Sequence, residues 1–104
     1  MNEILKNRIE KLIEELKPEI QQRATFVFGE FKAEKDNQLV LADTAYMTEP
    51  PLITFYLQSI EKISPDDDVL KQIISHEIIH TFSKSEDDAY SKQDSMNIFK
   101  DDVL

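Results

Sequence analysis

The sequence contains no cysteine and only one glycine. The absence of cysteine excludes disulfide bonds and thiolate metal ligands, and it is typical of a cytosolic protein. Any metal site must therefore use histidine, aspartate or glutamate side chains. A single glycine cannot form a glycine-rich phosphate loop, so the sequence disfavours nucleotide chemistry.

Basic residues are also scarce, at 12 lysines and arginines against 21 aspartates and glutamates, which gives a net charge of −9. This charge opposes binding to a nucleic-acid backbone or to an anionic membrane surface. No apolar run approaches the length of a membrane span, and residues 1–6 lack the order of basic and apolar residues found in a secretory signal. We therefore expect one cytoplasmic domain over residues 1–104 that binds neither nucleic acid nor membrane.

Apolar periodicity and turn residues divide the chain into helices and strands. An opening helix with one apolar face is expected to end near Pro18. Three segments rich in β-forming residues follow, at 24–31, 38–42 and 52–57, and the first two are expected to pair as a hairpin. Residues 43–48 remain unassigned.

Two further helices are predicted in the C-terminal half. Ser64 as N-cap and Pro65 at the first helical position mark the start of a helix that should run to about Phe82. Ser85 is followed by three acidic residues and repeats this start signal, so a last helix should begin there and continue through Phe99.

Residues 76–80, His-Glu-Ile-Ile-His, contain the only two histidines of the chain. Four residues are just over one helical turn, so His76 and His80 share a helix face and can bind one metal ion. Two imidazoles and a carboxylate suit tetrahedral Zn²⁺ and leave its fourth position for water. Glu77 lies beside that metal, where it can take a proton from the water during attack on a carbonyl carbon. The alternative is an amphipathic helix whose histidines share a face without binding metal.

Two histidines do not complete a catalytic zinc site, and with no histidine left the third protein ligand must be a carboxylate. Glu86 is the first candidate, because it starts the next predicted helix after a short turn that can return its side chain to the metal. Asp87 and Asp88 are the alternatives. The acids at 86–88 and at 66–68 also suit solvated helix starts, and neither run has the loop pattern of a calcium-binding EF-hand.

The chain resembles the zincin metallopeptidases, in particular the minigluzincins and the very short bacterial zincin-like peptidases. The resemblance rests on residues 53–57 as an edge strand, on the helix ending in residues 76–82, and on residues 86–89, Glu-Asp-Asp-Ala, which are similar to the glutamate-helix motif of gluzincins. It implies an α+β minimal zincin-like fold. In this fold a backing helix supports a small twisted mixed sheet with an antiparallel edge strand, and an active-site helix and a C-terminal glutamate helix follow.

The resemblance also implies zinc-dependent peptide hydrolysis. His76, His80 and Glu86 would bind one Zn²⁺ per chain, and Glu77 would act as general base and acid. Tyr90 stands where related gluzincins carry an acidic residue. Its hydroxyl can donate to a developing oxyanion, or its ring can simply pack.

An edge strand binds an extended peptide through main-chain hydrogen bonds. Thr54, Phe55 and Tyr56 are therefore the predicted substrate-binding residues, and a peptide or an unfolded protein is the predicted partner. Residues 84–104 are expected to form a helix and a tail that covers the cleft and limits activity, within one chain or in a homo-oligomer. A terminal helix that only packs on the domain is the alternative.

The apolar residues of that tail, among them Ile98 and Phe99, are expected to occupy an apolar groove at the cleft.

Three classes of function are consistent with the sequence: a zinc metallopeptidase, a zinc-binding interaction module without activity, and a small acidic binding domain without metal. Zinc stoichiometry separates the third class from the others. Replacing Glu77 with Gln separates the first two, because it removes the base and keeps the metal ligands.

Overall fold

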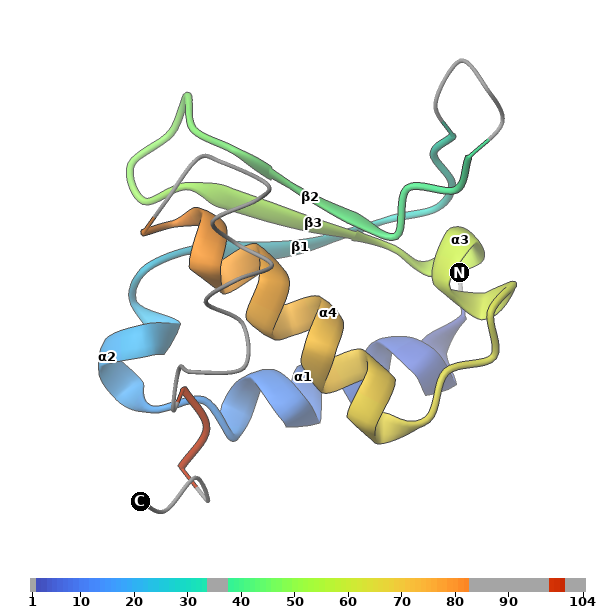
Figure 1. Cartoon of the computed structure of the whole chain (residues 1–104), viewed down its shortest axis with the longest axis horizontal. Helices are drawn as coiled ribbons and strands as arrows, with labels where there is room; N and C mark the ends of the chain where they lie inside the picture. Colours follow the sequence, from blue (N-terminus) through green and yellow to red (C-terminus); the bar gives the residue numbers. More distant parts are fainter. Residues whose placement is uncertain (1, 34–37, 83–97, 101–104) are drawn as a thin grey trace.

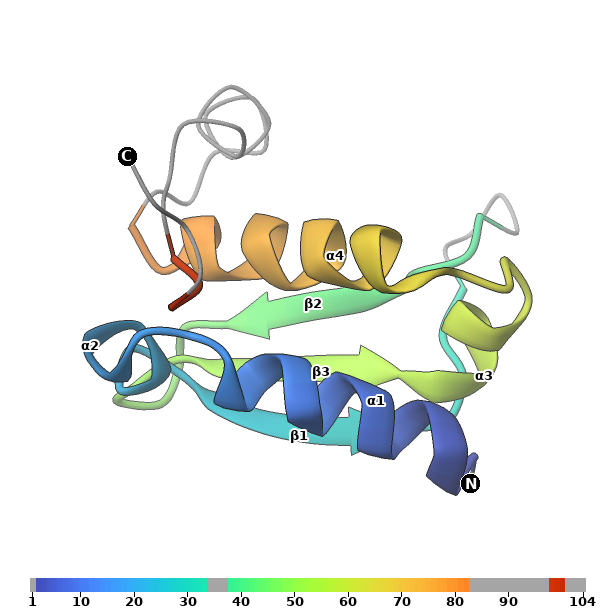
Figure 2. The same cartoon turned by 90° about the horizontal axis from the view of Figure 1, so that it is seen from below.

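The computed structural model describes residues 2–33, 38–82 and 98–100, which form a small α+β domain with two layers. A mixed three-stranded sheet is one layer, and helices α1 (Glu3–Glu14) and α4 (Asp67–His80) lie side by side on one face of it (Figures 1 and 2). The α+β class and the small mixed sheet are thus confirmed. The other elements are α2 (Pro18–Gln21), β1 (Thr25–Gly29), β2 (Ala42–Ala45), β3 (Leu52–Tyr56) and α3 (Leu57–Glu61).

Helix α1 is amphipathic, as the sequence predicts. Leu5, Ile9 and Leu12 recur at helical spacing and are all buried. The Asn2 side chain caps the helix, because its Oδ1 atom accepts a hydrogen bond from the Leu5 amide at 3.0 Å. The helix ends before Pro18, which begins α2, because its fixed φ and missing N–H suit the first turn of a helix.

The sheet has the order β1-β3-β2, with β1 parallel and β2 antiparallel to β3. The expected hairpin between residues 24–31 and 38–42 is therefore wrong, since the hairpin consists of β2 and β3. In the described part of the chain, the nearest contact to such a hairpin is one isolated bridge between Ala33, which follows the first expected strand, and Leu39 of the second. The cause is the position of β3, which comes last in sequence but pairs with both earlier strands.

The predicted edge strand at residues 52–57 is the central strand of the sheet. Its Ile53 and Phe55 side chains are 0% exposed, so this most apolar strand takes the position with a neighbour on each side and helices on one face. The antiparallel edge strand is β2, whose sequence Ala-Asp-Thr-Ala has no alternating apolar pattern. Because of that composition, apolar spacing does not mark residues 43–48 as a strand.

Helix α4 begins at Asp67, two residues after the predicted start. Ser64 has a φ of 45° and therefore cannot be the N-cap, which needs an extended backbone. Asp66 has that backbone and accepts a hydrogen bond from the Val69 amide at 2.9 Å. The helix ends at His80, close to the predicted end.

The core lies between the sheet and the two long helices. Ile98 and Phe99 are 1% and 6% exposed within this core, and Phe99 forms an antiparallel bridge with Leu16. Phe99 is therefore not in the predicted last helix, and Ile98 and Phe99 stabilise the domain instead of filling a groove at the cleft. Residues 83–97, which hold the rest of that predicted helix, lie outside the described residues.

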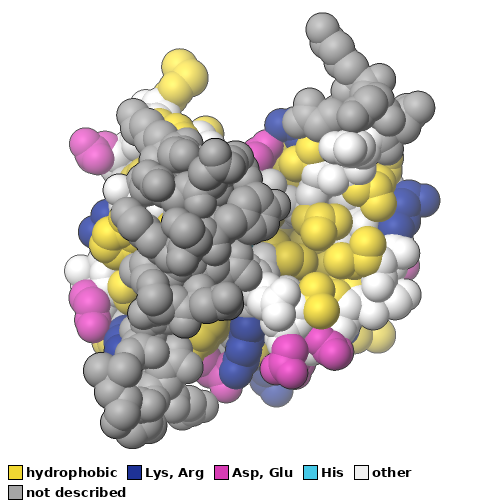
Figure 3. Space-filling view, in the orientation of Figure 1, with side chains coloured by type: hydrophobic (Ala, Val, Ile, Leu, Met, Phe, Trp, Pro, Cys, Tyr) yellow, Lys and Arg dark blue, Asp and Glu magenta, His cyan; other side chains and the backbone are white. Residues whose placement is uncertain are grey.

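No helix in the described part of the chain combines the length and the apolar character needed to cross a lipid bilayer. Apolar side chains and charged side chains of both signs mix on the face drawn in Figure 3. Among the described residues visible on this face, the acidic side chains lie at several separate places.

Candidate metal centre

The two histidines of the chain meet on the last turns of α4. The Nε2 atoms of His76 and His80 lie 3.2 Å apart, and the two rings are nearly perpendicular, at 88°. Two nitrogen ligands of a tetrahedral Zn²⁺, each at roughly 2.0–2.1 Å, are separated by about 3.3 Å, so the observed distance fits two ligands of one ion. The distance also fits a hydrogen bond between two neutral rings, in which one Nε2 donates and the other accepts.

Glu77 is buried beside the two imidazoles and is 6% exposed. One ligand atom from each of His76, Glu77 and His80 lies within 4.8 Å of the others, and no other group of this kind occurs among the described residues. The Thr44 hydroxyl on β2 donates a hydrogen bond to Glu77 Oε1 at 2.8 Å. A buried carboxylate needs hydrogen bonds or a cation, so the surroundings of Glu77 suit a metal ion next to it.

Hydrogen bonds from outside the helix hold the carboxyl end of α4. Arg23 Nε donates to Thr81 Oγ1 at 3.0 Å, and Arg23 Nη2 donates to the Thr81 carbonyl at 2.8 Å. The Arg23 guanidinium also lies 3.5 Å from the centre of the Phe82 ring. Tyr46 OH donates to the His80 carbonyl at 3.1 Å. The last carbonyls of a helix have no partner within the helix. Here Tyr46 satisfies the carbonyl of His80, and Arg23 holds the C-cap residue Thr81 that follows it.

A cavity of about 250 Å³ adjoins His80 at this end of α4. Drug-sized ligands occupy sites of roughly 300–1,000 Å³, so this cavity suits a single amino-acid side chain. Its walls come from the β2–β3 connection and from the end of α4, and they are both aromatic and polar. The lining residues are Tyr46, Thr48, Glu49, Pro51, His80, Thr81 and Phe82.

The structure brings together the three side chains of the predicted motif, His76, Glu77 and His80. It identifies them as a group that can bind a metal ion, without indicating which metal. The remaining predicted site residues lie outside the described residues: Glu86, Asp87, Asp88 and Tyr90.

The predicted substrate-binding strand is not at this site. Thr54, Phe55 and Tyr56 belong to β3, whose main chain pairs with a strand on each side. Phe55 points into the core, while Thr54 and Tyr56 point to the sheet face that α1 and α4 do not cover. The prediction of an open edge here is wrong, because an added strand needs main-chain groups that are not used within the sheet.

Three residues at the site escape prediction from the sequence. Thr44, Arg23 and Tyr46 contact residues of α4 or of its C-cap that are 33, 58 and 34 positions away along the chain. No local pattern marks such long-range partners. Thr44 lies in the segment that apolar spacing leaves unassigned.

Comparisons of the chain with protein-family models, with curated proteins and with solved structures found no match. The His-Glu-His cluster and its surroundings are therefore the features from which a function can be inferred. Three of these features bear on chemistry: the distance between the two imidazoles, the burial of Glu77 and the adjoining edge strand.

Proposed function

We propose that the protein is a zinc-dependent metallopeptidase that hydrolyses peptide bonds. The observation that carries this proposal is the 3.2 Å distance between the Nε2 atoms of His76 and His80, with the buried Glu77 carboxylate next to them. Imidazole nitrogens suit zinc, and the chain has no thiolate that would favour another type of site. The proposal agrees with the resemblance of the motif to zincins.

In this proposal His76 and His80 bind the metal through Nε2. Glu86 supplies the third ligand, with Asp87 and Asp88 as alternatives, because a carboxylate close after α4 in sequence can reach the end of the helix. When bound, zinc acidifies a water ligand and polarises the carbonyl of the peptide bond.

Glu77 is the general base and acid. Its carboxylate accepts a proton from the attacking water and then delivers that proton to the departing amine. Burial strengthens this role, because a site that excludes bulk water has a lower dielectric constant and stronger electrostatic interactions.

We place the peptide substrate along β2 instead of β3. β2 is one of the two edge strands of the described sheet, so an extended peptide can pair with its outward main-chain groups. The Thr44–Glu77 hydrogen bond brings this strand next to the base. The cavity beside His80 then receives one side chain of the substrate.

Metal analysis of protein purified without chelator is the first test. We expect one zinc per chain in the wild type, and loss of zinc in the His76→Ala and His80→Ala variants. Glu61→Gln, which removes an exposed carboxylate from α3, is the control and should keep its zinc. Zinc content in both histidine variants equal to the wild type would contradict the site.

Hydrolysis of casein or a fluorogenic peptide is the second test. Glu77→Gln should keep zinc and lower turnover by about 10²–10⁴-fold, which is the usual contribution of a general base. If the zinc-loaded wild type hydrolyses neither substrate, the proposed enzymatic function is wrong and the zinc-binding interaction module becomes the favoured function. If the protein binds no zinc, the favoured function becomes that of a small acidic binding domain that uses no metal.

A further inference from the structure

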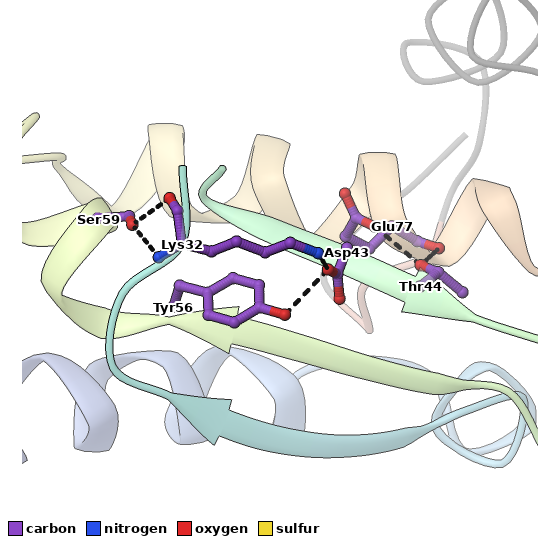
Figure 4. Close-up of polar contacts among 6 residues, drawn as sticks. All are labelled: Lys32, Asp43, Thr44, Tyr56, Ser59 and Glu77. Carbon is purple, nitrogen blue, oxygen red and sulfur yellow. Dashed lines mark hydrogen bonds and ion pairs between the residues drawn. The ribbon is translucent and has the colours of Figure 1, made fainter. Parts of the chain in front are cut away.

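We infer that Thr44 is a positioning residue for Glu77: its hydroxyl holds Oε1 of the carboxylate, so that Oε2 is the oxygen that takes and releases the proton. This inference rests on the proposed function. Thr44 belongs to the edge strand and Glu77 to the helix that carries the motif (Figure 4). The hydrogen bond therefore ties the base to the strand along which we place the substrate.

The contact between Thr44 and Glu77 depends on the hydroxyl group. Oγ1 donates to Oε1 at 2.8 Å, and it also lies 3.4 Å from the main-chain carbonyl of Glu77. A hydrogen bond to an ionised acceptor is shorter and stronger than one between neutral groups, and a buried site strengthens it further. A glutamate side chain has three rotatable bonds, so this contact reduces the number of carboxylate orientations.

Strand β2 is itself held by polar contacts on its other face. Side chains alternate along a strand, so Asp43 points away from Thr44. Asp43 Oδ2 accepts hydrogen bonds from Lys32 Nζ at 2.6 Å and from Tyr56 OH at 2.9 Å. Ser59 Oγ accepts from the Lys32 amide at 3.2 Å and donates to the Lys32 carbonyl at 3.1 Å. A shift of β2 that separates Thr44 from the base must also disturb the two contacts of Asp43 (Figure 4).

A pair of substitutions separates the hydroxyl of Thr44 from its shape. Thr44→Val keeps the branched shape and removes the donor, while Thr44→Ser keeps the donor and removes a methyl group. We expect Thr44→Val to lower kcat by about 10–100-fold, as misplaced catalytic groups do, with KM and zinc affinity within about twofold of the wild type. Thr44→Ser should retain kcat within about threefold. Thr25→Val, at an exposed threonine of β1, is the matched control and should change neither constant.

Two kinetic results would overturn the inference. The first is a wild-type kcat in Thr44→Val. The second is an equal loss of kcat in Thr44→Val and Thr44→Ser, which would assign the effect to packing of the methyl group. A change confined to KM would also overturn it, because a group that positions the base acts on the chemical step.

A double-mutant cycle in the zinc-free protein gives a readout that needs no activity. Thr44→Val should lower the Tm clearly more in the wild-type background than in the Glu77→Met background, where the carboxylate acceptor is gone and only the 3.4 Å contact to the main-chain carbonyl at position 77 remains. If the Tm changes of Thr44→Val and Glu77→Met simply add in the double variant, the proposed hydrogen bond between the two side chains is wrong. Absence of zinc-dependent turnover in the wild type would overturn the proposed function and the catalytic part of this inference, while the cycle would still decide whether Thr44 holds Glu77.

Discussion

The two ends of helix α4 are held in different ways. At the amino end, Asp66 caps the helix and Asp67 forms an ion pair with Arg8 at 3.0 Å, in which the side chains are 66% and 38% exposed. Arg8 also donates one partly buried hydrogen bond, to the Pro65 carbonyl at 3.0 Å. At the carboxyl end, the donors are Arg23 and Tyr46, in partly buried hydrogen bonds to main-chain and side-chain oxygens. Exposed ion pairs usually contribute about 0–1 kcal/mol, whereas hydrogen bonds from charged groups contribute about 1.5–3 kcal/mol.

The difference lies in the polar contacts and not in the apolar ones. Leu70 near the amino end and Ile78 near the carboxyl end are 1% and 0% exposed. The helix is therefore packed along its whole length, and its most firmly held polar end is the one that carries the His-Glu-His cluster. A metal centre requires such an arrangement, because ligands must be held close to their binding geometry.

The largest effects are expected from the apolar contacts. Leu70→Ala and Ile78→Ala should each lower the free energy of unfolding by about 2–5 kcal/mol, because each leaves a cavity in a closed core. Urea denaturation measures both values. Gln72→Ala, on the exposed face between them, should change stability by less than about 0.5 kcal/mol. A much smaller cost at Leu70 than at Ile78 would show that packing, too, differs between the two ends.

Zinc should stabilise the protein through the carboxyl end alone. At a free zinc concentration of 100 times Kd, we expect the free energy of unfolding to rise by about 2.7 kcal/mol, because zinc binds the folded chain. Thermal unfolding with and without zinc measures this increase. It should vanish in His80→Ala and persist in Arg8→Gln. Equal stabilisation of His80→Ala and wild type would place the zinc elsewhere.

The two arginines provide a matched pair for the polar contacts. Arg23→Gln should cost about 1.5–3 kcal/mol, because it removes charged hydrogen bonds to the end of the helix. Arg8→Gln should cost less than Arg23→Gln, because its ion pair with Asp67 is exposed and only one partly buried hydrogen bond, to the Pro65 carbonyl, is lost with it. The Arg8 contribution should also shrink in 1 M salt, which screens exposed ion pairs. Equal costs for the two variants would remove the proposed difference between the ends.

The smallest effect concerns Tyr56, on the sheet face that α1 and α4 do not cover. Burial raises the pKa of Tyr56 above its usual 10.0, and the hydrogen bond to Asp43 adds to this shift. The folded chain then retains the phenolic proton at a pH where the unfolded chain loses it. The stability from this group is complete below pH 10 and is lost as pH rises through the raised pKa.

Denaturation at a series of pH values above 10 tests this, with Tyr56→Phe as the reference. The wild type should lose stability more steeply than the variant, and neither end of α4 should influence the difference. Identical slopes would mean that Tyr56 titrates alike in the folded and the unfolded chain.

Features with a local cause are predictable from this sequence. The spacing of Leu5, Ile9 and Leu12 predicts α1, and a run of β-forming residues predicts β3. The i, i+4 spacing of His76 and His80 predicts that the two rings meet, because helix geometry alone determines it. Each of these features depends on residues that are close together in the sequence.

Features with a distant cause are not predictable in this way. The position of β2 in the sheet depends on its pairing with β3 and on the hydrogen bond from Thr44 to Glu77. The sequence Ala-Asp-Thr-Ala contains no pattern that predicts either contact. The start of α4 is harder to predict, because Ser64 and Asp66 are both suitable N-cap residues. The φ of Ser64 decides it, and that angle depends on how the chain leaves α3.

The described chain passes the His-Glu-His cluster at Phe82 and lies in the core again at Ile98. Phe82 lies against Arg23, and the Ile98 carbonyl accepts a hydrogen bond from the Lys17 amide at 2.8 Å. Residues 83–97 therefore connect two points that are both fixed on the domain. In the proposed zinc site, a carboxylate from this segment would meet the metal at an effective concentration set by chain length and not by the protein concentration. Glu86 follows Phe82 by four residues, a reach of at most about 14 Å, so zinc affinity should be the same in dilute and concentrated solutions.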